Sequence, residues 1–150
     1  MTQLKLDEFL PYRLSIASNC ASSAVATAYQ SLFGLRIPEW RLIAVIAESA
    51  AMTQQALGTV TQMDKVTVSR AAIALVTRGL VRRLPNPDDQ RSHLLSLTPA
   101  GQALYVSIAP KALELEARIF EGFSAKERAG FAAMLRRIEQ ASAALQPEQG

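Results

Sequence analysis

The feature that most constrains the fold is the stretch of residues 80–98, where the spacing of apolar residues changes from helical to strand-like. Two short strand candidates, "LVRRLP" and "HLLSLT", are separated by the turn residues Asn86, Pro87, Asp88 and Asp89. They predict a two-stranded hairpin. The sequence on both sides has the spacing of amphipathic helices, so the hairpin is expected to lie between helices.

Helical periodicity, with Gly34 as a stop and Thr53, Asp64 and Ser124 as N-caps, predicts four helices before this hairpin and two after it. The expected helices cover about residues 10–33, a segment starting at Pro38, and then about 53–59, 64–78, 99–121 and 124–145. Pro110 is expected to bend the fifth. A short helix, a tight turn, a second helix and a hairpin describe a winged helix-turn-helix. The predicted fold is therefore mainly α with a small β-wing.

The positive charge of the chain is concentrated in residues 65–91. This segment carries six Lys or Arg against two Asp, whereas the rest of the chain carries ten basic and eleven acidic residues. A basic segment on an otherwise balanced chain is typical of a protein that binds a polyanion. We therefore expect double-stranded DNA as a partner.

A helical wheel of residues 64–79 predicts which side of this helix reads DNA. The inward side is expected to hold Val66, Ser69, Ile73, Val76 and Leu80. The outward side is expected to hold Thr67, Arg70, Ala71, Ala74 and Arg78. Small residues with two arginines suit the major groove, where arginine pairs with guanine.

The tip of the hairpin predicts a second DNA contact. A wing beside a groove-bound helix lies near the minor groove, whose negative potential attracts arginine. Arg91 is the candidate, and Asp89, two residues earlier, is expected to fix its rotamer. The alternative is an ordinary surface ion pair that contributes roughly 0–1 kcal/mol.

The bulk properties indicate a soluble cytoplasmic protein. A chain of 150 residues suits one domain, with or without a dimerisation extension, and its longest aliphatic run is too short to span a bilayer. The N-terminus has no secretory signal pattern. One cysteine and one histidine provide neither a disulfide nor a metal site, and no cofactor is expected.

The segment "TQQALGTVTQMDKVTVSRAAIALVTRGLVRRLPNPDDQRSHLLSLTPAGQAL", residues 53–104, closely resembles the winged-helix core of the MarR (multiple antibiotic resistance regulator) family. The most specific part is Asp89-x-Arg91 leading to Leu97, Thr98 and Gly101. The segments "LPYRL" and "GLRIPEW" are also similar to family members, so the resemblance covers about residues 9–145.

The resemblance implies a single MarR-type domain that forms an obligate homodimer. Residues of about 9–36 and 100–146 would interlock as dimerisation helices, and about 38–98 would form the winged helix-turn-helix. In the family the wing arginine enters the minor groove and the preceding acid orients it, roles that match Arg91 and Asp89. The full set of expected DNA-binding residues is Lys65, Thr67, Val68, Ser69, Arg70, Arg78, Arg82, Arg83, Asp89 and Arg91.

Family members are typically repressors. They are released from DNA by a small effector, which is often aromatic, or by the oxidation of a cysteine. For an aromatic acid, the candidate pocket residues are Tyr12, Arg13 and Trp40. Cys20 is the only candidate for redox sensing, but no Lys, Arg or His lies near it in the sequence to activate its thiol.

The sequence thus predicts a repressor that binds a pseudo-palindromic operator. Two alternatives stay open: a winged-helix module that binds protein, and a redox-sensing regulator that uses Cys20. An enzyme is not expected, because the chain has no Cys-x-x-Cys motif and no Gly-rich phosphate loop.

Overall fold

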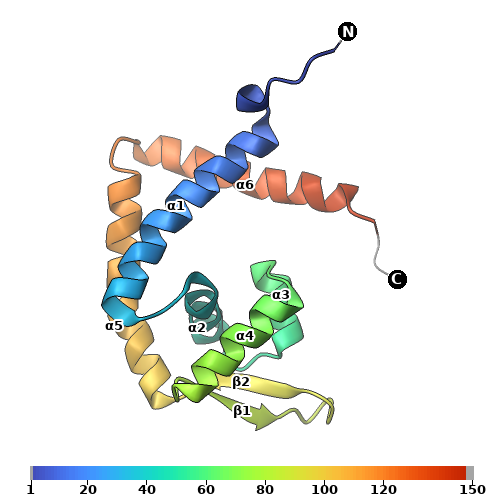
Figure 1. Cartoon of the computed structure of the whole chain (residues 1–150), viewed down its shortest axis with the longest axis vertical. Coiled ribbons are helices and arrows are strands. Elements are labelled where there is room, and N and C mark those ends of the chain that lie inside the picture. The colour runs from blue at the N-terminus through green and yellow to red at the C-terminus, as the bar shows by residue number, and fades with distance from the viewer. Residues whose placement is uncertain (1, 148–150) are drawn as a thin grey trace. The chain divides into compact units, whose positions relative to one another are not determined.

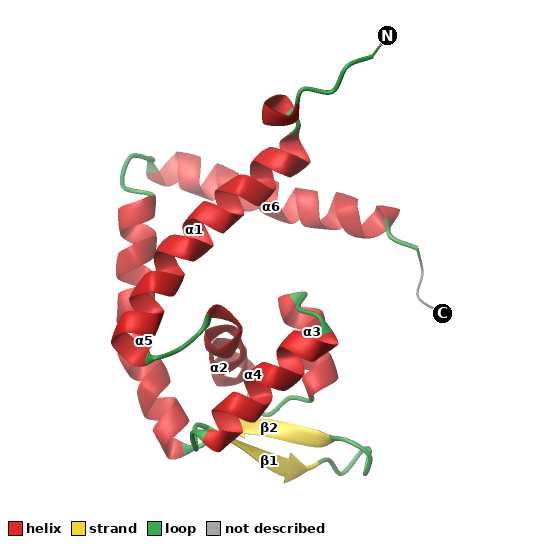
Figure 2. Cartoon of the chain, viewed as in Figure 1, coloured by secondary structure: helices red, strands yellow, loops and turns green. Residues whose placement is uncertain are grey.

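A computed structural model of the chain describes residues 2–147. Its elements are, in order, η1 (Leu6–Glu8), α1 (Leu10–Phe33), α2 (Ile37–Ser49), α3 (Gln54–Thr61), α4 (Lys65–Thr77), β1 (Val81–Pro85), β2 (His93–Leu97), α5 (Pro99–Ile119) and α6 (Ala125–Leu145) (Figures 1 and 2). The predicted winged helix-turn-helix fold is confirmed. Helix ends differ from the predicted ends by about two residues at most.

The chain divides into two compact units, one up to Ala112 and one from Leu113. The division falls inside α5, two residues after Pro110. The first unit therefore holds α1 to α4, the hairpin and the first part of α5. The second unit holds the end of α5 and all of α6.

The helices begin and end where the capping residues predict. Gly34 ends α1 in the left-handed conformation, with φ of 64°, which glycine adopts without steric cost. The hydroxyl of Thr53 accepts a hydrogen bond from the N–H of Ala56 and so caps α3. Ser124 and Glu127 form a reciprocal capping box at the start of α6.

The core of the first unit lies between α2, α3, α4 and the inner face of the hairpin, which gather around one centre in Figure 1. Its largest fully buried side chains are aliphatic and come from five elements and one loop: Leu35 before α2, Leu42 and Ile43 of α2, Leu57 of α3, Val68 and Leu75 of α4, Leu95 of β2 and Ile108 of α5. This packing fixes α4 and the hairpin relative to each other.

The hairpin pairs β1 with β2 in antiparallel register, from Val81 opposite Leu97 to Pro85 opposite His93. An isolated two-stranded hairpin is marginally stable in water. Here a short bridge before α3 reinforces it, because Met52 and Leu95 exchange two backbone hydrogen bonds of 3.1 and 2.7 Å. The wing is thereby attached directly to the segment that leads into α3.

Within residues 2–147, no helix is long and apolar enough to cross a membrane.

Candidate nucleic-acid interface

The structure corrects the predicted orientation of α4. The residues that face the core are Val68, Ala71, Ala72 and Leu75. Val66 and Ile73, which were predicted to face inward, are exposed, and Ala71, which was predicted to face outward, is buried. The buried face is centred about 130° from the predicted one, more than a third of a turn, since each residue advances about 100°.

The physical reason is that apolar residues occur on every side of this helix. Val68 and Leu75 lie seven residues apart, with Ala71 and Ala72 between them, and this narrow stripe fits closely against α2 and α3. The hydrophobic pattern alone did not distinguish that stripe from the one through Val66 and Ile73.

Val68 therefore cannot contact DNA, and its prediction as a DNA-binding residue is wrong. Its side chain is only 1% exposed. The other predicted residues in the first half of α4 remain accessible: Lys65 and Arg70 are exposed, and Thr67 and Ser69 are half-buried.

The structure shows an intramolecular role for Arg78, which the sequence predicted as a contact with DNA. Its guanidinium donates hydrogen bonds to the carbonyl oxygens of Gly34 (3.1 Å) and Phe33 (3.3 Å). These oxygens lie at the C-terminus of α1, where a cation also interacts favourably with the helix dipole. Arg78 thus connects the end of α4 to the end of α1.

The tip of the wing is a hydrogen-bonded loop. An Asp89 carboxylate oxygen accepts the backbone N–H of Arg91 at 2.9 Å, and the Asn86 amide donates to the Ser92 hydroxyl at 3.0 Å. In the described part of the chain, no ion pair joins the side chains of Asp89 and Arg91. Asp89 therefore positions the backbone of Arg91, whereas the sequence predicted that it would fix the arginine rotamer.

A polar cavity of about 410 Å³ lies between the wing and the N-terminal ends of α3 and α4. Four basic side chains line it, Lys65 of α4, Arg83 of β1, Arg91 of the tip and His93 of β2, and they outnumber its one acidic residue, Asp89. Such a set can attract a polyanion and pair with its phosphates.

Arg82 and Arg83, which were both predicted to contact DNA, differ in their position relative to this cavity. Arg83 lines it, but Arg82 does not, because successive residues of a strand point to opposite faces. Sequence reasoning missed the α3 residues at this site, Thr53, Gln54 and Gln55. The capping role of Thr53 was a usable signal, because the first N–H groups of a helix attract anions.

The structure does not form the predicted effector pocket within one chain. Trp40 packs against Tyr29 (ring centroids 5.3 Å apart) and stacks on Tyr105 (6.0 Å). Tyr12 and Arg13 are exposed on α1. Tyr12 precedes Tyr29 by 17 residues on the same helix, a separation of about 25 Å. Tyr12 and Arg13 therefore lie too far from Trp40 to share one small ligand within a chain.

The other sites considered are a metal-binding cluster and a reactive thiol. Residues 2–147 contain no cluster of three His, Cys, Asp or Glu side chains that could hold a metal ion. Cys20 is a free, exposed thiol on α1.

The cap of the recognition helix predicts a pH dependence of stability. The backbone N–H of Thr67 donates to the Asp64 carboxylate (2.7 Å), and this bond lowers the pKa of Asp64. A carboxylate whose pKa is lowered by folding stabilises the protein above its unfolded pKa, and the stabilisation is lost as pH falls through the folded pKa. Urea unfolding between pH 5 and 2.5 should therefore show a smaller loss of stability in Asp64→Asn, which keeps a neutral acceptor. Identical profiles for both proteins would contradict this role.

Comparisons with known proteins agree with this geometry. A profile of the MarR family matches residues 33–92. The multiple antibiotic resistance protein MarR of Escherichia coli (strain K12) is 30% identical over 99 residues, which are 65% of this chain and 69% of that protein.

Two solved structures have the same fold. BpsR of Bordetella bronchiseptica, studied for the regulation of its DNA binding by 6-hydroxynicotinic acid, has a TM-score of 0.84 and 22% identity, over 92% of this chain and 98% of its own. A mutant of MarR from E. coli in complex with operator DNA has a TM-score of 0.78 and 22% identity, over 91% and 99%. The relatives include a named transcriptional regulator, HosA of Escherichia coli O111:H-, which is 25% identical over 104 residues, 69% of this chain and 77% of that protein. The chain therefore belongs to the MarR family of DNA-binding transcriptional regulators.

Proposed function

We propose that this regulator is a repressor that binds a pseudo-palindromic operator as a homodimer and is released by a small effector. The observation that carries the proposal is the cavity where Lys65, Arg83, Arg91 and His93 meet. In addition, α4 has no acidic residue from Lys65 to Thr77, and the carboxylate of its N-cap, Asp64, is engaged by the N–H of Thr67.

The proposed contacts follow from accessibility. Thr67, Ser69 and Arg70 of α4 would face the major groove, and Lys65 would contact a phosphate at its edge. Arg91 would enter the adjacent minor groove from the wing. Arg82 and Arg83, on opposite faces of β1, would contact different phosphates, and Asp89 would hold the backbone at the tip.

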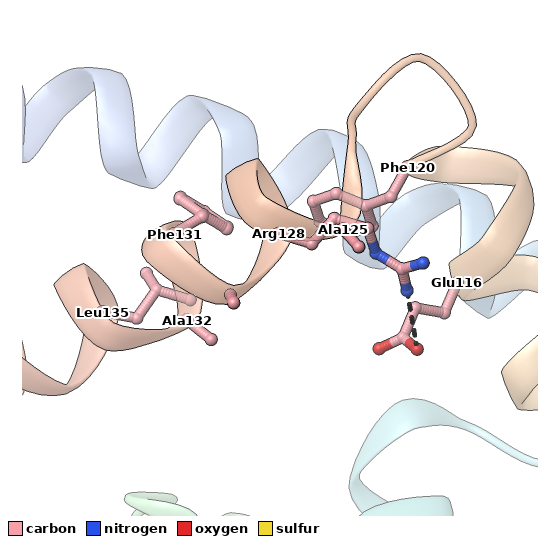
Figure 3. A pocket seen from close by; sticks show the side chains of 8 residues that line it. Glu116, Phe120, Ala125, Arg128, Phe131, Ala132 and Leu135 are labelled. Atoms are coloured by element: carbon pink, nitrogen blue, oxygen red, sulfur yellow. Dashed lines mark hydrogen bonds and ion pairs between the residues drawn. The ribbon is translucent and has the colours of Figure 1, made fainter.

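Exposed apolar side chains support the homodimer. In α6, all of whose residues the structure describes, none is buried, and Phe131, Met134 and Ile138 lie exposed along one stripe. In the same unit, a mostly apolar pocket of about 620 Å³ includes Phe120 and Leu135 (Figure 3). Contiguous exposed apolar side chains on one face of a helix commonly mark a protein–protein interface.

A polar contact closes one end of this pocket. Arg128 forms an ion pair with Glu116 (3.4 Å), marked by the dashed line in Figure 3, and its guanidinium lies 5.8 Å from the Phe120 ring centroid. Both charged side chains are solvent-accessible, so the pair adds little stability. A second copy of the chain, related by two-fold symmetry, would cover the apolar lining. Half-sites in DNA would then lie about 34 Å apart.

The proposed effector is a small aromatic molecule. It is supported by BpsR, which has the same fold and whose DNA binding is regulated by 6-hydroxynicotinic acid. Tyr12, Arg13 and Trp40 do not form one site within a chain, so an effector site that used all three would need residues from both subunits. The protein would act in the cytoplasm, where bacterial DNA lies.

Fluorescence anisotropy tests the function. The purified protein is titrated onto the intergenic duplex beside its own gene and onto a scrambled duplex, at several salt concentrations. Specific binding by two subunits, which weakens steeply with salt, is the expected result. Weak binding that does not distinguish the two duplexes would contradict the proposal and favour a module that binds protein.

Two substitutions in α4 should distinguish a contact with the phosphate backbone from a contact with the bases. Lys65→Ala is expected to weaken binding to both duplexes alike and to reduce the salt slope by about two, because the dimer loses two phosphate contacts. Arg70→Ala is expected to reduce the preference for the specific duplex by about 2–6 kcal/mol, about 1–3 kcal/mol for each subunit. The same titrations measure both effects. An equal loss of preference in the two variants would show that α4 does not read bases through Arg70.

A further inference from the structure

The exposed face of the recognition helix carries two aliphatic side chains that the DNA contacts proposed above do not use. Val66 is 58% exposed and Ile73 is 53% exposed. The solvent side of a helix normally carries charged or polar residues. Two β-branched aliphatic residues at such positions therefore require an explanation beyond helix formation.

The geometry of α4 places both beside Arg70. Val66 and Ile73 are seven residues apart, almost two full turns, so they lie on the same side of the helix and about 10 Å apart along its axis. Arg70 lies four residues after Val66 and three before Ile73, positions that share one helical face. The exposed face thus presents an aliphatic group, a guanidinium and a second aliphatic group in a row.

The core does not account for these side chains. The first unit is packed against the opposite face of α4, through Val68, Ala71, Ala72 and Leu75. The surroundings of Val66 and Ile73 are instead cationic: Lys65 and Arg70 are exposed on the same helix, and Lys65 lines the cavity that holds Arg83 and Arg91. A surface that is both apolar and positively charged complements the major groove, where thymine methyl groups lie between two phosphate chains.

We propose that Val66 and Ile73 contact the C5-methyl groups of thymines on either side of the base that Arg70 reads. This inference rests on the proposed function, because it requires α4 to lie in the major groove. Both side chains are β-branched and restricted at χ1, so little entropy is lost when they are held against DNA. Each operator half-site should then contain two thymines that flank the base contacted by Arg70.

Replacement of thymine by uracil tests the methyl group alone, because uracil also pairs with adenine and differs from thymine only in lacking that group. The full-length protein first selects a duplex from a random pool. Anisotropy then compares this duplex with versions in which each thymine is replaced by uracil in turn. At two positions per half-site we expect about fourfold weaker binding, the effect of losing one buried methyl group.

Variants assign the two positions. Ile73→Ala should bind the thymine and uracil duplexes equally at one position, and Val66→Ala should do so at the other. Val106→Ala is the matched control, because Val106 is similarly exposed (61%) but lies on α5, and it should keep the wild-type response at both positions.

Three results would overturn the inference. If the protein selects a sequence but binds thymine and uracil equally everywhere, Val66 and Ile73 do not read methyl groups, and the DNA-binding function stands. If no sequence is selected, the proposed function itself is wrong. If Val66→Ala or Ile73→Ala lowers the molecular mass in solution, the occupant of this face is a second copy of the chain.

Discussion

Arg91→Ala is expected to weaken binding to the specific duplex by about 30-fold or more, with helical content and subunit stoichiometry unchanged. Arg91 lies at the wing tip, lines the cationic cavity and is exposed. Loss of one specific arginine contact typically costs about 1–3 kcal/mol, and a two-fold symmetric dimer loses two of them. Anisotropy titrations at fixed salt measure the effect, and circular dichroism and size-exclusion chromatography check the fold and the dimer.

Arg137→Ala provides the matched control, since Arg137 is an exposed arginine of α6 and lies outside the cavity. It should bind DNA as the wild type does. If Arg91→Ala and Arg137→Ala have the same affinity, the wing does not enter the minor groove.

Two substitutions at Asp89 extend this test to the tip itself. Asp89→Asn keeps a side-chain oxygen for the N–H of Arg91 and should retain most of the affinity, whereas Asp89→Ala removes the acceptor and should weaken binding. The opposite order of affinities would indicate that Asp89 acts through its charge.

Gly101→Ala is expected to destabilise the first unit by about 3 kcal/mol, which corresponds to a fall in Tm of roughly 6–12 °C. A Cβ at this position would overlap the backbone carbonyl of Leu80 and would also press on the side chain of Leu97. A backbone carbonyl cannot rotate away as a side chain can, and this one accepts the N–H of Thr98 at 3.1 Å. The substitution would therefore force α5 away from the start of β1.

Gly130→Ala makes the same chemical change in α6, where the nearest described atoms lie more than 4 Å from the added Cβ. Alanine favours a helix over glycine by about 1 kcal/mol, so this variant should be as stable as the wild type or more stable. Thermal unfolding of both variants at one protein concentration, followed by circular dichroism, measures the difference. Equal Tm values would show that the contact between Gly101 and Leu80 is not tight in solution.

The sequence predicted the order of the elements because the signals for helix ends and turns are local. Gly34, Thr53, Asp64 and Ser124 each cap or end a helix where predicted, and every such effect depends on residues within about four positions. The hairpin was predicted for the same reason, from the turn residues between its strands.

The orientation of α4 was not predicted correctly, because it depends on the surface that receives the helix. Val66 and Ile73 form as good an apolar stripe on a wheel as Val68 and Leu75. Only the packing against α2 and α3 decides which stripe is buried. Val68, which was predicted to contact DNA, is therefore buried. Ile73, which was predicted to face the core, is exposed on the same face as Arg70.

The sequence by itself determined the family, the winged fold and the concentration of positive charge in residues 65–91, since these follow from composition, periodicity and local capping. The tertiary structure alone decided which of those charges act together. Packing brings Lys65, Arg83 and Arg91 of that segment to one cavity beside His93, turns Arg78 toward the end of α1 and separates Tyr12 from Trp40. The physical reason is that a cap or turn is stabilised by adjacent residues, whereas a site is assembled by contacts between segments that the linear sequence does not specify.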